Sequence, residues 1–132
     1  LVNLSGDFAV IGPQPGEKPW AIGVANPEKK NSLLAKMEIL EGGVASSGDF
    51  SGQASIGLKN FSALVNAKTG SLCTGLRAVT VASHLCSHAG SLARAARSLG
   101  EDDGLQKLEQ ESYKFVAMKK NTQVQGKSAE VK

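Results

Sequence analysis

Short apolar runs, several of them alternating with polar residues, fill the first two thirds of the chain and predict β-strands. The predicted strands lie within residues 2–11, 20–25, 33–40, 61–65 and 76–85. Residues 12–19 hold three prolines and Gly16, so they are expected to form a surface loop. The run Val79-Thr80-Val81 is β-branched throughout and indicates a buried central strand.

The apolar period changes from that of a strand to that of a helix in the last third of the chain. From Ser91 onward apolar residues recur at helical spacing, with Ser87 or Ser91 to cap the start and Gly100 to end the helix. A second helix is predicted over 104–111, preceded by three acidic residues that favour its positive end. A last strand is predicted over 113–118. Residues 119–132 show no regular spacing of apolar residues, so we expect a flexible tail there.

Composition is that of one globular domain with one core, since 132 residues include 41% apolar and 20% charged residues. The net charge of +3 is small and scattered, so no nucleic-acid partner is expected. No apolar run approaches the roughly 20 residues that cross a bilayer, so we expect no transmembrane segment. The chain starts at Leu1 within a predicted strand, which suggests a mature form, a cleavage product or a fragment.

Short blocks of glycine, hydroxyl-bearing and acidic residues follow one another in a fixed order, ahead of the Val-Thr-Val strand. Small residues let backbone N–H groups approach phosphates, and hydroxyls add donors. Each block alone is also typical of a plain surface turn. The blocks are Asn-Leu-Ser-Gly-Asp at 3–7, Gly-Val-Ala-Ser-Ser-Gly-Asp-Phe at 43–50 and Asn-Ala-Lys-Thr-Gly at 66–70.

In their order these blocks resemble the C-terminal part of the ApbE family, the FAD:protein FMN transferases, which move FMN from FAD onto a threonine of a target protein. The resemblance covers residues 1–118 and implies one partial domain there, with the tail at 119–132. It implies an α+β fold, with a mixed, mostly antiparallel sheet and two C-terminal helices on one face. FAD is the implied ligand. The cofactor-binding candidates are Gly6, Asp7, Ser46, Ser47, Gly48, Thr69 and Gly70.

The chain also departs from the family pattern. Where the family has a His-Ile-Ile-Asp-Pro turn, Ala63, Asn66 and Ala67 replace the histidine, aspartate and proline. The family holds a divalent metal with an aspartate and, four residues later, a threonine on the helix after Val-Thr-Val, and Gly90 and Arg94 stand at those positions. Because Mg²⁺ needs oxygen ligands, we expect no metal there and little transferase activity. No catalytic residue is assigned.

Other candidate residues surround the predicted strand-to-helix junction. Arg94 and Arg97 either neutralise a pyrophosphate or form the solvent-exposed face of an amphipathic helix. His84 and His88 near Cys86 suggest a metal, but the spacing supplies no fourth ligand, and none is expected.

The two cysteines match neither a metal knuckle nor a redox CxxC pair, and a disulfide between Cys73 and Cys86 is left open.

Three hypotheses follow for the function. The first is a catalytically inactive ApbE-like module that acts as a structural or assembly subunit. The second is a FAD-binding protein without chemistry, and the third is half of an FMN transferase that another chain completes. Exposed sheet edges would suit such a protein partner. The sequence does not indicate a compartment.

Overall fold

The computed structural model describes residues 1–49, 54–56, 59–61, 64–111, 114–127 and 130–131. Within them the strands are β1 (Val2–Leu4), β2 (Asp7–Val10), β3 (Trp20–Ala25), β4 (Leu33–Ile39), β5 (Gly42–Gly48), β6 (Ala54–Ile56), β7 (Lys59–Phe61), β8 (Leu76–Ser83), β9 (Lys114–Lys119), β10 (Val124–Lys127) and β11 (Glu130–Val131). The helices are α1 (Cys86–Leu99) and α2 (Glu101–Gln110).

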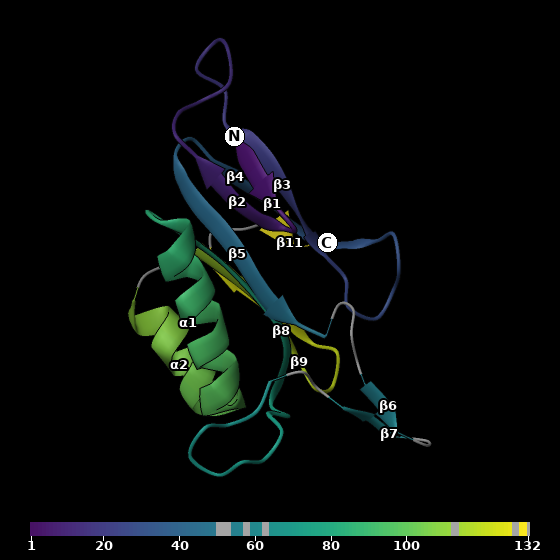
Figure 1. The fold of residues 1–132 in the computed structure, drawn as a ribbon. Helices are drawn as coiled ribbons and strands as arrows, with labels where there is room; N and C mark the ends of the chain where they lie inside the picture. Colours follow the sequence, from purple (N-terminus) through teal and green to yellow (C-terminus); the bar gives the residue numbers. More distant parts are fainter. Residues whose placement is uncertain (50–53, 57–58, 62–63, 112–113, 128–129, 132) are drawn as a thin grey trace.

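The larger sheet has six strands in the order β1-β2-β5-β8-β9-β10, and every neighbouring pair is antiparallel (Figure 1). Strand β8 lies in its interior, between β5 and β9. Val79, Thr80 and Val81 are each at most 2% exposed, as the β-branched run predicts. Both faces of this strand are covered, so its continuous apolar run leaves no apolar side chain exposed to solvent there.

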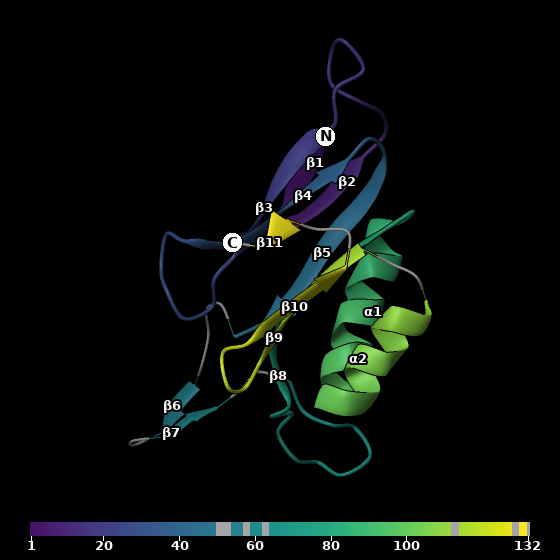
Figure 2. The ribbon, with the colours of Figure 1, turned by 180° about the vertical axis from the view of Figure 1, so that it is seen from behind.

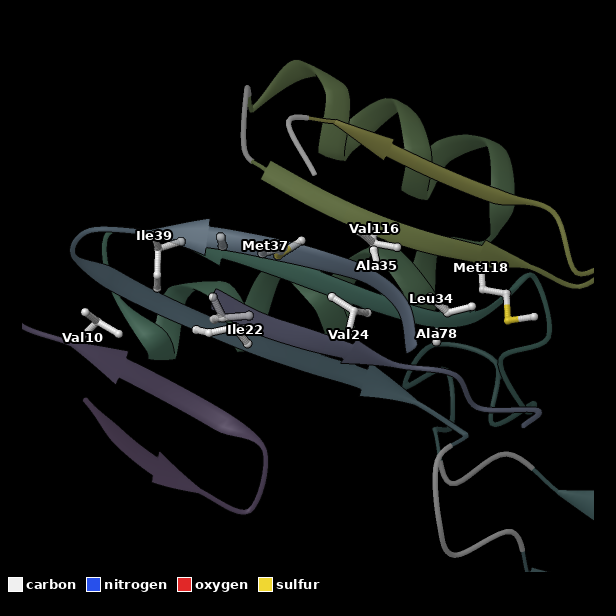
Figure 3. Close-up of a cluster of buried hydrophobic side chains, with 12 residues drawn as sticks. Val10, Ile22, Val24, Leu34, Ala35, Met37, Ile39, Ala78, Val116 and Met118 are labelled. Atoms are coloured by element: carbon white, nitrogen blue, oxygen red, sulfur yellow. The ribbon is translucent and has the colours of Figure 1, made fainter. Parts of the chain in front are cut away.

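A second, three-stranded sheet in the order β11-β4-β3 packs on one face of the larger sheet. In β3 the burial alternates, with Ile22 and Val24 buried and Ala21 and Gly23 exposed, because successive side chains point to opposite faces. Figure 3 shows the apolar side chains of this cluster. The buried members are Val10, Ile22, Val24, Leu34, Ala35, Met37, Ile39, Val44, Ala78, Ala82, Val116 and Met118.

Helices α1 and α2 lie together on the other face of the larger sheet, as both views show (Figures 1 and 2). A second buried cluster joins α1 and α2 to β5, β8 and β9. Its members are Ala45, Leu76, Val79, Val81, Ala89, Leu92, Ala93, Ala96, Leu105, Leu108, Phe115 and Ala117. The described chain therefore has helix, sheet and sheet layers with two apolar interfaces.

Helix α1 begins earlier than the sequence predicts. It starts at Cys86, and Leu85 at the N-cap provides no side-chain hydrogen bond. The predicted caps are wrong, since Ser87 lies inside the helix and the Ser91 hydroxyl donates to the Ser87 carbonyl at 2.9 Å. Packing determines this end instead: a Cβ built on Gly43 of β5 would lie 2.3 Å from the Cys86 backbone nitrogen.

Helix α2 also begins earlier, at Glu101, so the three acidic residues occupy its first turn instead of preceding it. Their negative charges still lie at the positive end of the helix, which stabilises it.

Residues after Lys119 include strands that the sequence does not predict. Strand β10 pairs with β9, with Val124 opposite Met118, and β11 pairs with β4. The expectation of a flexible tail therefore missed two strands. Strand β10 holds one apolar residue, Val124, and β11 is two residues long, so neither produces an apolar period in the sequence.

The predicted α+β class, the mostly antiparallel strands and the two helices on one face are confirmed. The strands divide between separate sheets, however, and the strand predicted over 33–40 ends at Ile39, before β5 begins. Of the strand predicted over 61–65, residues 62–63 lie outside the described residues, and Val65 forms only an isolated bridge with Leu72. In the described part of the chain, neither helix is long and apolar enough to cross a membrane.

Candidate functional site

The Ala-Ser-Ser-Gly block lies in a strand and not in the predicted turn. Ser46 and Ser47 belong to β5 and pair with Thr80 and Val79 of β8. Because side chains alternate along a strand, the two serines point to opposite faces. The Ser46 hydroxyl lies 2.8 Å from Thr80 Oγ1, whereas the Ser47 hydroxyl accepts from Arg97 Nη1 of α1 at 3.4 Å. The two hydroxyls therefore do not form one phosphate cradle.

Arg97 is the buried centre of the helix-facing side. Its side chain is 3% exposed and its Nη2 donates to Asp49 Oδ1 at 2.7 Å, with the Asp49 side chain 13% exposed. Its Nε donates to the Leu76 carbonyl at 3.0 Å. The sequence offered two interpretations of Arg97, a pyrophosphate ligand and part of a solvent-exposed helix face. The structure supports neither, because the guanidinium joins α1 to Ser47 and Asp49. Nothing in the sequence separates Arg97 from the exposed Arg94 except helical register.

Gly90 and Arg94 occupy the two positions at which the family resemblance implies metal ligands. Gly90 is buried, and a Cβ built on it would lie 3.5 Å from the Ala45 Cβ and 3.0 Å from Arg94 Nη1. The Arg94 guanidinium thus folds back over Gly90, as helical side chains do toward the N-terminus. A permanent positive charge next to a position without a side chain does not fit a divalent cation.

Gly6 and Asp7 lie at the tight connection between β1 and β2. Gly6 has φ of +95°, and its N–H donates to the Asn3 side-chain oxygen at 2.9 Å. The Gly6 N–H is therefore bonded within the block at 3–7. The Asp7 carboxylate accepts the Ser46 backbone N–H at 3.4 Å. Asp7 therefore lies next to β5 and close to the start of α1.

Thr69 and Gly70 lie in an exposed turn that Asn66 organises. The Asn66 Oδ1 accepts the backbone N–H groups of Lys68 at 2.9 Å and Thr69 at 3.3 Å, and Thr69 Oγ1 accepts the Ser71 N–H at 3.2 Å. Gly70 takes the left-handed conformation, with φ of +70°. This is an Asx turn, a local structure that asparagine makes without any ligand.

The structure brings several of the candidate residues to one end of α1. Asn66 Nδ2 donates to the Ser98 carbonyl at 3.4 Å, next to Arg97, which holds Ser47 and Asp49. Gly48 follows Ser47 in the same strand, whereas the Ser46 side chain faces away from the helix. The helix-facing donors at this end are therefore committed to internal bonds. The turn at Thr69 and Gly70 is exposed at the same end, and Arg94 is exposed farther along α1, toward its middle.

The described residues offer no alternative metal centre of the usual kind: no group of three or more His, Cys, Asp or Glu side chains among them converges on one point. Cys73 and Cys86 are free thiols, so the open question of a disulfide is answered against one. Burial raises the pKa of the Cys86 thiol, and the nearby Asp7 carboxylate raises it further. A thiol with a raised pKa is a poor nucleophile at neutral pH.

Comparisons with known proteins give a consistent result. The chain is similar to the ApbE protein of Thermotoga maritima, with 21% identity and a TM-score of 0.84 over 94% of this chain and 41% of that one. It is similar to the flavin transferase ApbE of Vibrio cholerae, with 21% identity and a TM-score of 0.70 over 97% of this chain and 41% of that one. It is also similar to the flavinyl transferase ApbE of Pseudomonas stutzeri, with 25% identity and a TM-score of 0.68 over 94% of this chain and 37% of that one.

These likenesses cover only about two fifths of each related structure. A search of curated proteins found no significant match. The sequence profile of the ApbE family matches residues 1–118, which include all the candidate site residues. This chain belongs to the ApbE family.

Proposed function

We propose that this chain is an ApbE-like module that no longer supports metal-dependent flavin transfer and serves as a structural or assembly subunit. The observation that carries the proposal is the face that α1 turns toward β5. Gly90, Arg94 and Arg97 follow one another there at helical spacing, so these three helix positions carry two cations and no side-chain oxygen.

Flavin transfer from FAD breaks a pyrophosphate bond, and such reactions depend on a metal ion and fixed donors that neutralise developing charge. An arginine supplies positive charge, but it cannot coordinate the reacting oxygens as an octahedral Mg²⁺ does. The loss of both implied ligands at once, at Gly90 and Arg94, therefore removes the main source of rate enhancement.

A structural role also fits the commitment of the helix-facing donors. Arg97 joins α1 to β5 through the Ser47 hydroxyl and the Asp49 carboxylate. Side chains of the block at 43–50 therefore stabilise the packing of the helix on the sheet. The Arg97–Asp49 ion pair is largely buried, with side-chain exposures of 3% and 13%, so the loss of either member would be costly.

We infer that a protein partner or a further segment completes the fold, because the related structures are more than twice as long as the region this chain covers. Strand β1 is an edge strand of the six-stranded sheet, and its Val2 and Leu4 side chains are 57% and 74% exposed. Such an edge can pair with another strand.

FAD binding without chemistry is the second candidate, and the exposed Arg94 favours it, since a guanidinium can form paired hydrogen bonds to a phosphate. A half-enzyme completed by another chain is the third candidate. It would require that chain to supply the metal ligands that Gly90 and Arg94 do not provide.

A fluorescence titration of FAD with the purified chain, with and without Mg²⁺, separates these candidates. The structural role predicts no saturable quenching under either condition. Saturable quenching that is equal with and without Mg²⁺, and is weakened by Arg94→Met but not by the control Lys107→Met, would favour the FAD-binding candidate. Saturable quenching that requires Mg²⁺ would overturn the proposal.

A further inference from the structure

A small polar cluster lies at the N-terminal end of α1, away from the Arg97 network. Ser83 is the last residue of β8, and its Oγ lies 3.3 Å from His84 Nδ1 and 3.0 Å from His88 Nδ1. The two imidazole rings are 5.2 Å apart between centroids and tilted by 53°. These are the only two histidines in the sequence.

The two Nδ1 atoms converge on one hydroxyl, and that hydroxyl has a single proton to donate. In the tautomer that carries its proton on Nε2, each ring directs its Nδ1 lone pair toward Ser83 Oγ. Two ring nitrogens and one hydroxyl oxygen therefore meet in one small volume.

We propose that Ser83, His84 and His88 form a binding site for a transition-metal dication of the Zn²⁺ class, with the two Nδ1 atoms as protein ligands. Imidazole is a preferred ligand of Zn²⁺, Ni²⁺ and Cu²⁺, and it does not suit Mg²⁺. Two rings bound to one Zn²⁺ at about 2.0–2.1 Å, in tetrahedral geometry, have centroids about 5 Å apart. The observed separation of 5.2 Å therefore needs little movement of either ring.

The backbone that carries the site is fixed before any metal binds. Gly42 has φ of +111°, and a Cβ built on it would lie 2.4 Å from the Ser83 carbonyl oxygen, so β5 packs directly against this end of β8. His88 is held within the first turn of α1. Pre-organised ligands lose less conformational freedom on binding.

The surroundings supply solvent access and negative charge. Ser83 and His84 line an open groove of about 950 Å³ together with Glu41, so water can complete the coordination. Lys114 also lines the groove, but its Nζ donates to the Glu38 carbonyl at 3.0 Å.

Cys86 is not part of this site, although the sequence places it between the histidines. Its Sγ lies 3.9 Å from the Val44 carbonyl, on the side of the sheet. The structure thus replaces the grouping that the sequence suggested, two histidines with a cysteine, by two histidines with a serine.

Calorimetric titration of the purified chain with Zn²⁺ tests the site, with His84→Gln, His88→Gln and Cys86→Ala as variants. We expect one equivalent of Zn²⁺ to bind. Each histidine substitution should weaken binding by about tenfold or more, since even changes in outer-shell partners of metal ligands cost about 10- to 100-fold. Cys86→Ala should leave the affinity unchanged, and circular dichroism should show that each variant keeps its fold.

Electron paramagnetic resonance with Cu²⁺ adds a readout that stability does not affect. We expect coupling to two imidazole nitrogens in the parent chain and to one in either histidine variant. Absence of saturable Zn²⁺ binding, binding that survives both histidine substitutions, or binding that Cys86→Ala abolishes would overturn the proposal.

Discussion

The two ends of α1 pack on the same sheet in different ways. At the N-terminal end, the helix backbone lies directly on β5 because Gly43 has no side chain, and a built Cβ would lie 2.3 Å from the Cys86 nitrogen. At the C-terminal end, the helix is joined to β5 through the buried Arg97, which binds Asp49 and Ser47. Steric fit determines one end, and a charged hydrogen-bond network determines the other.

Under the proposed function, the family fold is kept while its chemistry is lost, and this difference offers a physical reason. Between the two ends lie Gly90 and Arg94, the positions of the implied metal ligands. Because packing at both ends holds the helix, α1 does not depend on a metal ion to stay in place. Substitutions at either end should therefore reduce stability, whereas substitution of Arg94 should not.

The largest effect is expected at the C-terminal end. Arg97→Met keeps most of the side-chain volume but leaves Asp49 without its partner, so the free energy of unfolding should fall by about 3–4 kcal/mol. Urea denaturation followed by circular dichroism measures this change.

Arg94→Met, one turn away and exposed, is the matched control and should change stability by less than about 0.5 kcal/mol. The double variant Arg97→Met with Asp49→Asn should recover part of the loss. Equal effects at Arg94 and Arg97 would refute the network.

A somewhat smaller effect is expected at the N-terminal end. Gly43→Ala would force the backbones of β5 and α1 apart and lower the free energy of unfolding by about 2–3 kcal/mol, the upper range for overpacking. Gly12→Ala is the control, since a Cβ there meets nothing within 4 Å, and it should be nearly neutral. If both substitutions are neutral in thermal or urea denaturation, the close approach is not real.

The turn that supports the C-terminal end should contribute less. Asn66→Ala removes the acceptor for two backbone N–H groups and the bond to the Ser98 carbonyl, at a cost of about 1 kcal/mol. Lys68→Ala in the same exposed turn should have no measurable effect. A loss at Lys68 as large as that at Asn66 would contradict the Asx-turn assignment.

The smallest effect concerns the chemistry of the N-terminal end. Burial and the Asp7 carboxylate raise the pKa of Cys86, so its thiolate fraction at pH 8 lies below that of an ordinary thiol. Asp7→Asn should therefore speed alkylation of Cys86 a few-fold at pH 8, as mass spectrometry of the labelled peptide would measure.

The raised pKa also has a consequence for stability. The unfolded chain loses the Cys86 proton at a lower pH than the folded chain does, so this group's contribution to stability is lost as pH rises above about 8.5. Cys86→Ala should remove that part of the pH dependence. An unchanged alkylation rate in Asp7→Asn would show that the carboxylate does not act on the thiol.

The sequence predicts the fold well where apolar period and burial coincide. The Val79-Thr80-Val81 strand is central, and the helical period in the last third corresponds to α1 and α2. The start of α1 was wrong because close packing against Gly43 replaces a capping side chain, and such packing leaves no local signal. Strand β10 was missed because Val124 is its one apolar residue, so it has no apolar period.

The candidate site was less predictable because alternation along β5 depends on register, which a short serine block does not reveal. Ser46 and Ser47 face opposite sides of the sheet, and only one of them meets α1. The distinction between Arg94, exposed, and Arg97, buried, likewise needs the position of the helix on the sheet. That Gly90 and Arg94 carry no side-chain oxygen, in contrast, follows from residue identity alone.

The central claim is that the cationic face of α1 does not support metal-dependent flavin transfer. The most direct measurement incubates the purified chain with FAD, Mg²⁺ and an acceptor peptide that the Vibrio cholerae flavin transferase modifies under the same conditions. Release of AMP and covalent flavin on the peptide are followed by chromatography and mass spectrometry. Neither product is expected above the protein-free background. AMP release with peptide flavinylation, abolished when the Mg²⁺ is chelated, would contradict it.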